Sequence, residues 1–215
     1  MRALGFSFGR SGRTAEEAPR LTELRDRLIA IVQEHGHLVL DEPVQLASGD
    51  LSRHFVDGKK ALARGSDLRL AAEALLELVA DEGVEFDAVG GLTMGADQFA
   101  HAVAMLSGDV EWFSVRKQAK ERGTKRRIEG ARLGPGRRVL LVDDVVTRGG
   151  SIVDAFEAIV AEGATVVCAV TLVDRGGHAD AFFEKQGVPY RPLVRHVDLG
   201  IPAVGDESGP TAATG

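Results

Sequence analysis

The stretch VLLVDDVVTRGGS, residues 139–151, decides the fold class. It joins a continuous apolar run to two aspartates and then to the run TRGGS, residues 147–151. Continuous apolar runs are typical of parallel strands that are buried on both faces of a sheet. Ligands of open parallel α/β sheets bind beyond the carboxyl ends of the strands. We therefore expect Asp143 and Asp144 at a ligand-binding edge, where the chain leaves the core and the carboxylates need not be buried.

The TRGGS run leads into a helical pattern, IVDAFEAIVAE, at residues 152–162. A helix amino terminus that follows glycines presents free N–H groups and the positive end of the helix dipole, which suits a phosphate. Ser151 and Asp154 resemble a capping box with Ser151 as the N-cap. Two neighbouring carboxylates suit a sugar diol, a hydrated divalent cation or a cationic transition state. Together these features predict a ligand with a sugar diol at one end and a phosphate at the other.

Competing phosphate motifs are missing from the sequence. It contains no GxxxxGK[ST] motif, and no GxGxxG follows the first strand, so the P-loop and dinucleotide-binding folds are disfavoured.

Helical and strand patterns alternate on both sides of this stretch, which predicts an α/β fold with a mainly parallel sheet flanked by helices. Helices are expected at residues 17–34, 66–82, 95–106 and 151–162. Strands are expected at residues 86–92, 110–117, 137–144, 165–174 and 190–194. The ends, 1–15 and 206–215, are rich in small and polar residues and are expected to be flexible. One domain at 16–205 is therefore predicted.

Composition narrows the function classes. The chain has 215 residues, of which 44% are hydrophobic, and a net charge of −6 that argues against a general nucleic-acid or anionic-membrane binder. Cys168, the single cysteine, lies within an apolar run and fits a reducing cytoplasm. No apolar stretch is long enough to span a membrane, so a soluble cytoplasmic protein is expected. The histidines of HGH, residues 35–37, are interpreted as a helix end rather than as metal ligands.

The 139–151 stretch resembles the 5-phosphoribosyl-1-diphosphate (PRPP) signature of the type I phosphoribosyltransferases. Four further segments resemble the orotate phosphoribosyltransferases in that family's order, from about residue 20 to 200. These segments are LASGDLSRHFVDG (46–58), VGGLTMGADQFAHAVA (89–104), VRKQAKERGTKRRIEG (115–130) and LVDR (172–175). The resemblance implies the type I phosphoribosyltransferase fold, with a twisted sheet and a small hood formed by about residues 16–60 and the C-terminal segment.

The resemblance also implies site residues. Catalytic roles fall on Lys120, Asp143 and Asp144, of which the aspartates would contact the ribose hydroxyls and stabilise an oxocarbenium-like transition state. The residues implied to bind PRPP are Arg116, Lys117, Lys120, Arg122, Asp143, Asp144, Val145, Val146, Thr147, Arg148, Gly149, Gly150 and Ser151. The implied pyrophosphate loop consists of Thr93, Met94 and Gly95. The residues implied to face orotate are Thr147, Arg175 and Phe55.

The function that the resemblance implies is transfer of the 5-phosphoribosyl group from PRPP to orotate in pyrimidine biosynthesis. Pyrophosphate and orotidine 5′-monophosphate would be the products. Mg²⁺ would enter on the diphosphate and ribose oxygens without direct protein ligands. A homodimer that shares its basic loop across the interface is also implied.

Three departures from the family pattern leave alternatives open. Arg122 stands in place of a loop histidine, Ala47 in place of a lysine, and GKKALA (58–63) in place of an LR-like run. A phosphoribosyltransferase for a different nucleobase is one alternative. The other is a non-catalytic PRPP-sensing regulator that binds RNA or DNA, which the acidic net charge disfavours.

The loop RKQAKERGTKRR, residues 116–127, reverses the sign of the protein's charge locally, with seven basic residues in twelve. Apolar anchors are missing from it and Gly123 permits bending, so we expect a mobile loop. Cations that close over a departing pyrophosphate stabilise its developing charge and exclude water.

Overall fold

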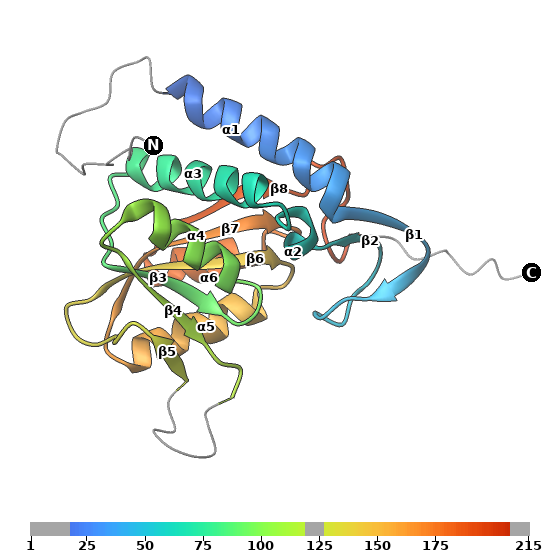
Figure 1. Cartoon of the computed structure of the whole chain (residues 1–215). Coiled ribbons are helices and arrows are strands. Elements are labelled where there is room, and N and C mark those ends of the chain that lie inside the picture. The colour runs from blue at the N-terminus through green and yellow to red at the C-terminus, as the bar shows by residue number, and fades with distance from the viewer. Residues whose placement is uncertain (1–17, 119–126, 207–215) are drawn as a thin grey trace, which may run out of the picture.

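A computed structural model describes residues 18–118 and 127–206. Within these residues the chain forms a six-stranded sheet in the order β5-β4-β3-β6-β7-β8 and a separate hairpin, β1-β2 (Figure 1). The strands are β1 His37–Gln45, β2 Leu51–Val56, β3 Ala88–Leu92, β4 Glu111–Val115, β5 Ile128–Gly130, β6 Arg138–Val146, β7 Thr165–Asp174 and β8 Tyr190–Arg195. The helices are α1 Ala18–Ile31, the π-helical turn η1 Val32–Gly36, α2 Gly58–Ala61, α3 Gly65–Asp81, α4 Asp97–Ser107, α5 Gly150–Ala161 and α6 His178–Gln186.

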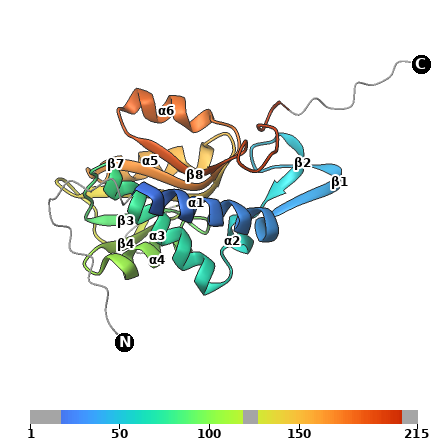
Figure 2. The same ribbon diagram turned by 90° about the horizontal axis from the view of Figure 1, so that it is seen from above.

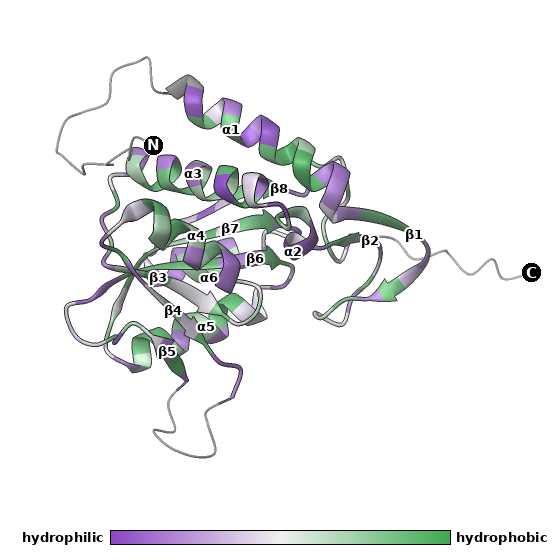
Figure 3. Cartoon of the chain, in the orientation of Figure 1, coloured by the Kyte–Doolittle hydropathy of each residue, from purple (hydrophilic) through white to green (hydrophobic). Residues whose placement is uncertain are grey.

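The main sheet separates two hydrophobic layers. Strands β4, β3, β6, β7 and β8 run parallel, and β5 pairs antiparallel with β4. Helices α1, α3 and α4 cover one face of the sheet, and α5 and α6 cover the other (Figure 2). The central strands are largely hydrophobic, whereas α1 alternates hydrophobic and hydrophilic residues along its length (Figure 3). The predicted α/β fold with a mainly parallel sheet is confirmed.

Two glycines let the central strands pack closely. A Cβ atom at Gly90 would overlap the carbonyl oxygen of Phe113, and one at Gly91 would overlap that of Val142. Both glycines lie in β3, whose neighbours are β4 and β6. The short GG run therefore sets how closely the middle of the sheet is packed.

The sequence predicted the core strands and the longer helices. In the described part of the chain the structure adds the β1-β2 hairpin, the short helix α2, the short strand β5 and helix α6. The predicted capping box is wrong. Helix α5 begins at Gly150 after Gly149 in the left-handed region, without a side-chain cap, and Asp154 binds Arg127 instead.

The strand order places a ligand crevice. From β3 the chain crosses to β4 on one side, whereas β6 lies on the other side of β3 and leads to β7. The loops after β3 and β6 therefore diverge, and such a switch point in an open parallel sheet forms a crevice. The β1-β2 hairpin lies beyond this end of the sheet (Figure 1). Across residues 18–118 and 127–206, no helix is both long and apolar enough to cross a bilayer.

Candidate active site

Asp143 and Asp144 are buried, with 4% and 7% of their surface exposed, so the expectation that the chain leaves the core at this pair is wrong. Strand β6 continues to Val146, and its last residues still pair with β7. Glycines also pack against the pair. A Cβ atom at Gly95 would overlap Asp144 Oδ1, and one at Gly58 would lie 2.8 Å from Asp144 Cβ. The acid pair therefore lies at the floor of the crevice rather than on its rim.

Three donors hold the acid pair. The Asp144 amide donates to Asp143 Oδ1 at 2.9 Å, and the Val145 amide donates to Asp144 Oδ1 at 2.8 Å. Lys59 Nζ donates to Asp144 Oδ2 at 2.9 Å. Burial, and then the neighbouring Asp144 charge, raise the pKa of Asp143. Burial is the largest single effect and lowers the pKa of Lys59, but the hydrogen bond to Asp144 and the charges of Asp144, Asp57 and Asp143 together raise it.

The turn after β6 leads directly into helix α5. Gly149 has a φ of 84°, a conformation that favours glycine, and it packs on α6, where a Cβ atom would lie 3.6 Å from Ala179 Cβ. Gly150 and Ser151, which follow it, are exposed. The first turn of the 12-residue helix α5 thus borders solvent at the crevice. Free N–H groups at such a helix start favour an anion.

Arg148 points away from this turn, toward the hairpin. Its guanidinium donates to both carboxylate oxygens of Asp50, at 2.7 and 2.6 Å. The Arg148 hydrogen bonds lower the pKa of Asp50 to about 2. The guanidinium is therefore engaged with another element, whereas the backbone of Arg148 remains part of the predicted phosphate turn.

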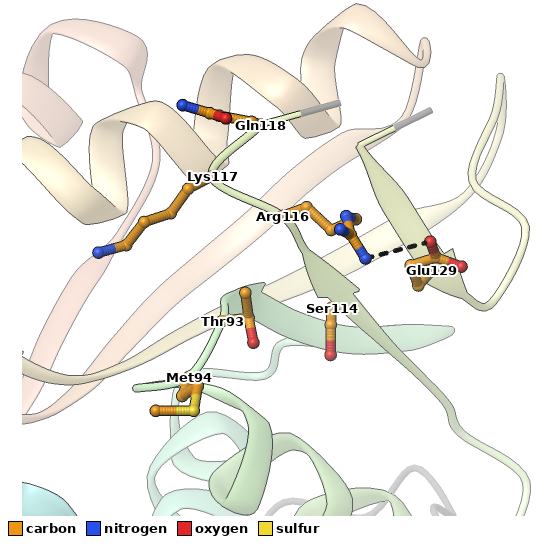
Figure 4. Close-up of a pocket in the computed structure, with 7 residues that line it drawn as sticks. All are labelled: Thr93, Met94, Ser114, Arg116, Lys117, Gln118 and Glu129. Atoms are coloured by element: carbon orange, nitrogen blue, oxygen red, sulfur yellow. Dashed lines mark ion pairs between the residues drawn. The ribbon is translucent and has the colours of Figure 1, made fainter. Parts of the chain in front are cut away.

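A cavity of about 620 Å³ lies at the ends of β3 and β4 (Figure 4). It is lined by Thr93, Met94, Ser114, Arg116, Lys117, Gln118 and Glu129. Two of these residues form an ion pair, with Arg116 Nη1 3.9 Å from Glu129 Oε1. Met94, which lines the cavity, is followed by Gly95, which packs against Asp144. The structure thus brings Thr93 and Met94 of the predicted pyrophosphate loop together with the first three residues of the predicted basic loop.

Asp97 organises the floor of this cavity. Its two carboxylate oxygens accept hydrogen bonds from Thr93 Oγ1 and Ser114 Oγ, both at 2.6 Å. The Thr93–Met94 peptide bond is cis. Asp97 is the first residue of α4 and therefore ties the loop after β3 to strand β4.

Arg175 is buried beneath the hairpin, with 1% of its surface exposed. Its Nη1 donates to the backbone oxygen of His54 at 2.7 Å. His54 Nδ1 lies 3.0 Å from His37 Nε2, and their rings stack with centroids 5.2 Å apart. Burial, followed by the charges of His54 and Arg175, lowers the pKa of His37. Phe55, the next residue of β2, is 38% exposed.

Most of the predicted site residues that the structure describes lie at one end of the sheet, on the end of β6 and on the loops after β3, β4, β6 and β7, and Phe55 lies on β2 of the hairpin. Lys120 and Arg122 lie outside the described residues. Sequence reasoning missed three side chains that bind predicted site residues or their neighbours: Lys59, Asp97 and Asp50. The spacing of Lys59 carries no signal, because it reaches Asp144 across 85 residues. Within the described part of the chain, no group of three or more His, Cys, Asp or Glu residues could hold a metal ion.

Comparisons with known proteins agree with this geometry. Residues 61–181 match the family model of the phosphoribosyl transferase domain. The chain is similar to the orotate phosphoribosyltransferase of Corynebacterium glutamicum (strain R), with 39% identity over 180 residues that cover 83% of this chain and 95% of that protein.

Solved structures give the same result. The orotate phosphoribosyltransferase of Mycobacterium tuberculosis H37Rv in complex with Fe(III) dicitrate superposes with a TM-score of 0.71 at 36% identity, covering 83% of this chain and 99% of that one. The same enzyme in complex with PRPP gives a TM-score of 0.68 at 33% identity, with 83% and 99% coverage.

Proposed function

The chain belongs to the orotate phosphoribosyltransferase family, and on this premise we propose how its residues carry out the reaction. It is a pentosyltransferase that moves the 5-phosphoribosyl group from PRPP to orotate in pyrimidine biosynthesis. A ring nitrogen of orotate forms a bond to C1 of the ribose. The bond from C1 to the diphosphate oxygen breaks, and its electron pair leaves with pyrophosphate.

The observation that carries the proposal is the pairing of the Asp143–Asp144 floor with the phosphate turn four residues further on. We propose that the aspartates accept hydrogen bonds from the ribose hydroxyls and that the amides of residues 147–151 hold the 5′-phosphate. A buried carboxylate pair with a net negative charge also stabilises positive charge that develops on the sugar ring.

We place the diphosphate in the cavity at the ends of β3 and β4. Arg116 and Lys117 line it and carry positive charge toward the departing group. Lys120 and Arg122, which the sequence places in the same loop, are proposed to complete this charge. The loop after β3, which contains Thr93, Met94 and Gly95, is proposed to lie against the diphosphate. The loss of one preplaced donor of this kind costs about 3 kcal/mol of barrier.

We assign the base side to the hairpin and the end of β7. Phe55 offers an aromatic face, and Arg175 offers a cation that matches the carboxylate of orotate. Thr147, the first residue of the phosphate turn, is proposed to face the base as well. The hairpin and the C-terminal segment that follows β8 together form the proposed hood.

Mg²⁺ is proposed to enter bound to the diphosphate and ribose oxygens, where it would neutralise charge on the leaving group. Mg²⁺ retains several waters and binds substrate phosphates more often than a dedicated protein cage. The acid pair offers two hard oxygen donors near the same position but is already held by Lys59. A homodimer and a cytoplasmic location remain predictions.

The direct test mixes the purified protein with PRPP, Mg²⁺ and orotate and follows orotate absorbance together with pyrophosphate release. We expect the amount of orotate consumed to equal the amount of pyrophosphate released. Pyrophosphate release with another nucleobase, and none with orotate, would move the assignment to a different base. Ala47 and Arg122 are the departures that favour this second candidate.

A further inference from the structure

Asp50 and Arg148 join two parts of the site that lie 98 residues apart in sequence. Asp50 ends the turn of the hairpin, directly before β2, and Arg148 lies in the phosphate turn after β6. The contact is bidentate, with Nε to Oδ2 at 2.7 Å and Nη2 to Oδ1 at 2.6 Å. We call this pair the Asp50–Arg148 clasp.

The hairpin depends on few contacts for its position. It forms its own two-stranded sheet and shares no ladder with the main sheet among the described residues. Two-stranded hairpins are marginal on their own. Arg175 holds one point of the hairpin, at the His54 backbone oxygen, and the clasp holds another at the turn.

The turn itself is well defined. The Leu46 amide donates to the Asp50 backbone oxygen at 2.8 Å, and the Gly49 amide donates to the Leu46 oxygen at 2.9 Å. These bonds fix where the Asp50 side chain starts. Asp50 is 16% exposed and Arg148 is 49% exposed, so the carboxylate is the more enclosed partner.

The C-terminal segment reaches the same point. A Cβ atom at Gly205 would lie 3.2 Å from Arg148 Nη2, and the Val204 amide donates to the Arg175 backbone oxygen at 2.8 Å. The guanidinium of Arg148 therefore lies where the hairpin turn, the phosphate turn and the C-terminal segment meet.

Charge and geometry favour a clasp that persists at neutral pH. Bidentate arginine–carboxylate pairs fix orientation as well as distance. An exposed pair contributes little to global stability, so its effect should be on relative position rather than on folding.

We propose that the Asp50–Arg148 clasp positions the hairpin, with its base-binding residues, over the phosphate turn during phosphoribosyl transfer. Asp50 is a positioning residue that acts through Arg148 and touches neither reactant. The inference rests on the proposed function, because the base side and the phosphate side are assigned there. It adds the contact that sets the spacing between them.

A double-mutant cycle tests the clasp. The enzymes are wild type, Asp50→Ala, Arg148→Ala and the double variant, each assayed for kcat and for KM of orotate at saturating PRPP. We expect Asp50→Ala to raise the KM of orotate about fivefold or more, a coupling within the range seen for residues in contact. In the Arg148→Ala background the same change should alter that KM less than twofold.

The controls separate charge from position. Asp50→Glu keeps the charge and should recover most of the loss. Asp41→Ala removes an exposed aspartate from β1 of the same hairpin and should stay within twofold of wild type. The clasp would be overturned if the fold-change in the KM of orotate in the double variant equals the product of the fold-changes in the two single variants. It would also be overturned if Asp50→Ala has the same KM of orotate as Asp41→Ala.

A second measurement does not depend on the substrate. Hydrogen exchange at the amides of β1 and β2 should speed up in Asp50→Ala and not in Asp41→Ala. A wild-type enzyme that consumes no orotate would refute the proposed function, and the exchange rates would still decide the clasp. Unchanged exchange in Asp50→Ala would refute the clasp even if orotate is turned over.

Discussion

Lys59 is the residue that most changes the interpretation of the acid pair. Its ammonium lies 2.9 Å from Asp144 Oδ2 and 3.9 Å from Asp57 Oδ1, on a side chain that is half exposed. Two buried carboxylates side by side repel each other, and a nearby cation offsets that repulsion. Lys59 therefore acts as the counter-ion of the buried pair.

Replacement of Lys59 by methionine should shift the pH dependence of catalysis. Burial and Asp144 raise the pKa of Asp143, and the Lys59 charge opposes that rise. Without the ammonium the pKa of Asp143 rises further, so the pair keeps its proton to higher pH. The acidic limb of the profile of kcat/KM for PRPP should move up by about one pH unit.

Lys60→Met is the matched control for Lys59→Met, because it removes the same charge from the next residue of α2. Its profile should overlay the wild-type profile. Lys59→Arg keeps the cation and should also leave the limb in place. An unshifted limb in Lys59→Met would contradict the counter-ion role.

At the residue scale the sequence predicts chemistry better than environment. The DD motif with the following glycine run locates Asp143 and Asp144 at the end of a strand, which the structure confirms. Their burial was not predictable from the local sequence, because it depends on the close packing of Gly58 and Gly95, which belong to other segments of the chain. The Lys59 and Asp97 contacts were missed for the same reason.

At the element scale, the base of the basic loop is closed and anchored. The Arg116 amide donates to the Arg127 oxygen at 2.8 Å, and Arg127 Nε donates to the Arg116 oxygen at 2.9 Å. The Arg127 guanidinium also donates to both carboxylate oxygens of Asp154 on α5, at 2.8 and 2.6 Å. Helix α5 therefore holds the point where the loop returns to the sheet.

Asp154→Ala should weaken catalysis more than stability. Arg127 is 28% exposed and Asp154 is 41% exposed, so the loss of their ion pair should cost less than about 1 kcal/mol of unfolding free energy. Catalysis should fall several-fold if the basic loop closes over pyrophosphate as proposed, because the loop loses its anchor. Thermal unfolding and kcat measured on one preparation compare the two effects.

Glu162→Ala, at the far end of α5, serves as the control for the Asp154 variant. It should change neither quantity appreciably. If the Asp154→Ala variant loses as much unfolding free energy as transition-state stabilisation calculated from kcat, the Arg127–Asp154 ion pair would have a purely structural role.

Elements with a strong hydrophobic period were predictable, and the others were not. Strands β6 and β7 are continuous apolar runs, and α3 has a clear helical period. Strand β1 contains Pro43 and is exposed along most of its length, so neither alternation nor a continuous run marks it. Strand β5 has three residues, and α6 has nine with a weak apolar face.

At the scale of the whole molecule, parallel connections bring most of the described ligand groups to one end of the sheet. The loops after β3, β4, β6 and β7 come from segments spread over about 85 residues of chain, from residue 93 to residue 177. The resemblance and the strand pattern predicted this convergence. The hairpin, which covers the same end, carries exposed apolar side chains that the strand pattern did not reveal.

The proposed homodimer, with its basic loop shared across the interface, leads to a prediction about whole subunits. Lys120→Ala and Asp144→Asn should each be inactive alone. If Lys120 serves the partner's site, a mixed dimer holds one site with both changes and one with neither. Random exchange of subunits in an equal mixture should restore about a quarter of the wild-type activity.

The complementation is measured on subunits that are unfolded and refolded together, with size-exclusion chromatography confirming a dimer. The control is a mixture of Asp143→Asn with Asp144→Asn. Each site takes both aspartates from one subunit, so every site in the mixture carries one of the two changes and no intact site can form. If Lys120 instead serves its own subunit, every site in the mixed dimer carries one change. The Lys120→Ala and Asp144→Asn mixture would then stay as inactive as the control, because exchange of subunits cannot separate two groups that belong to the same site.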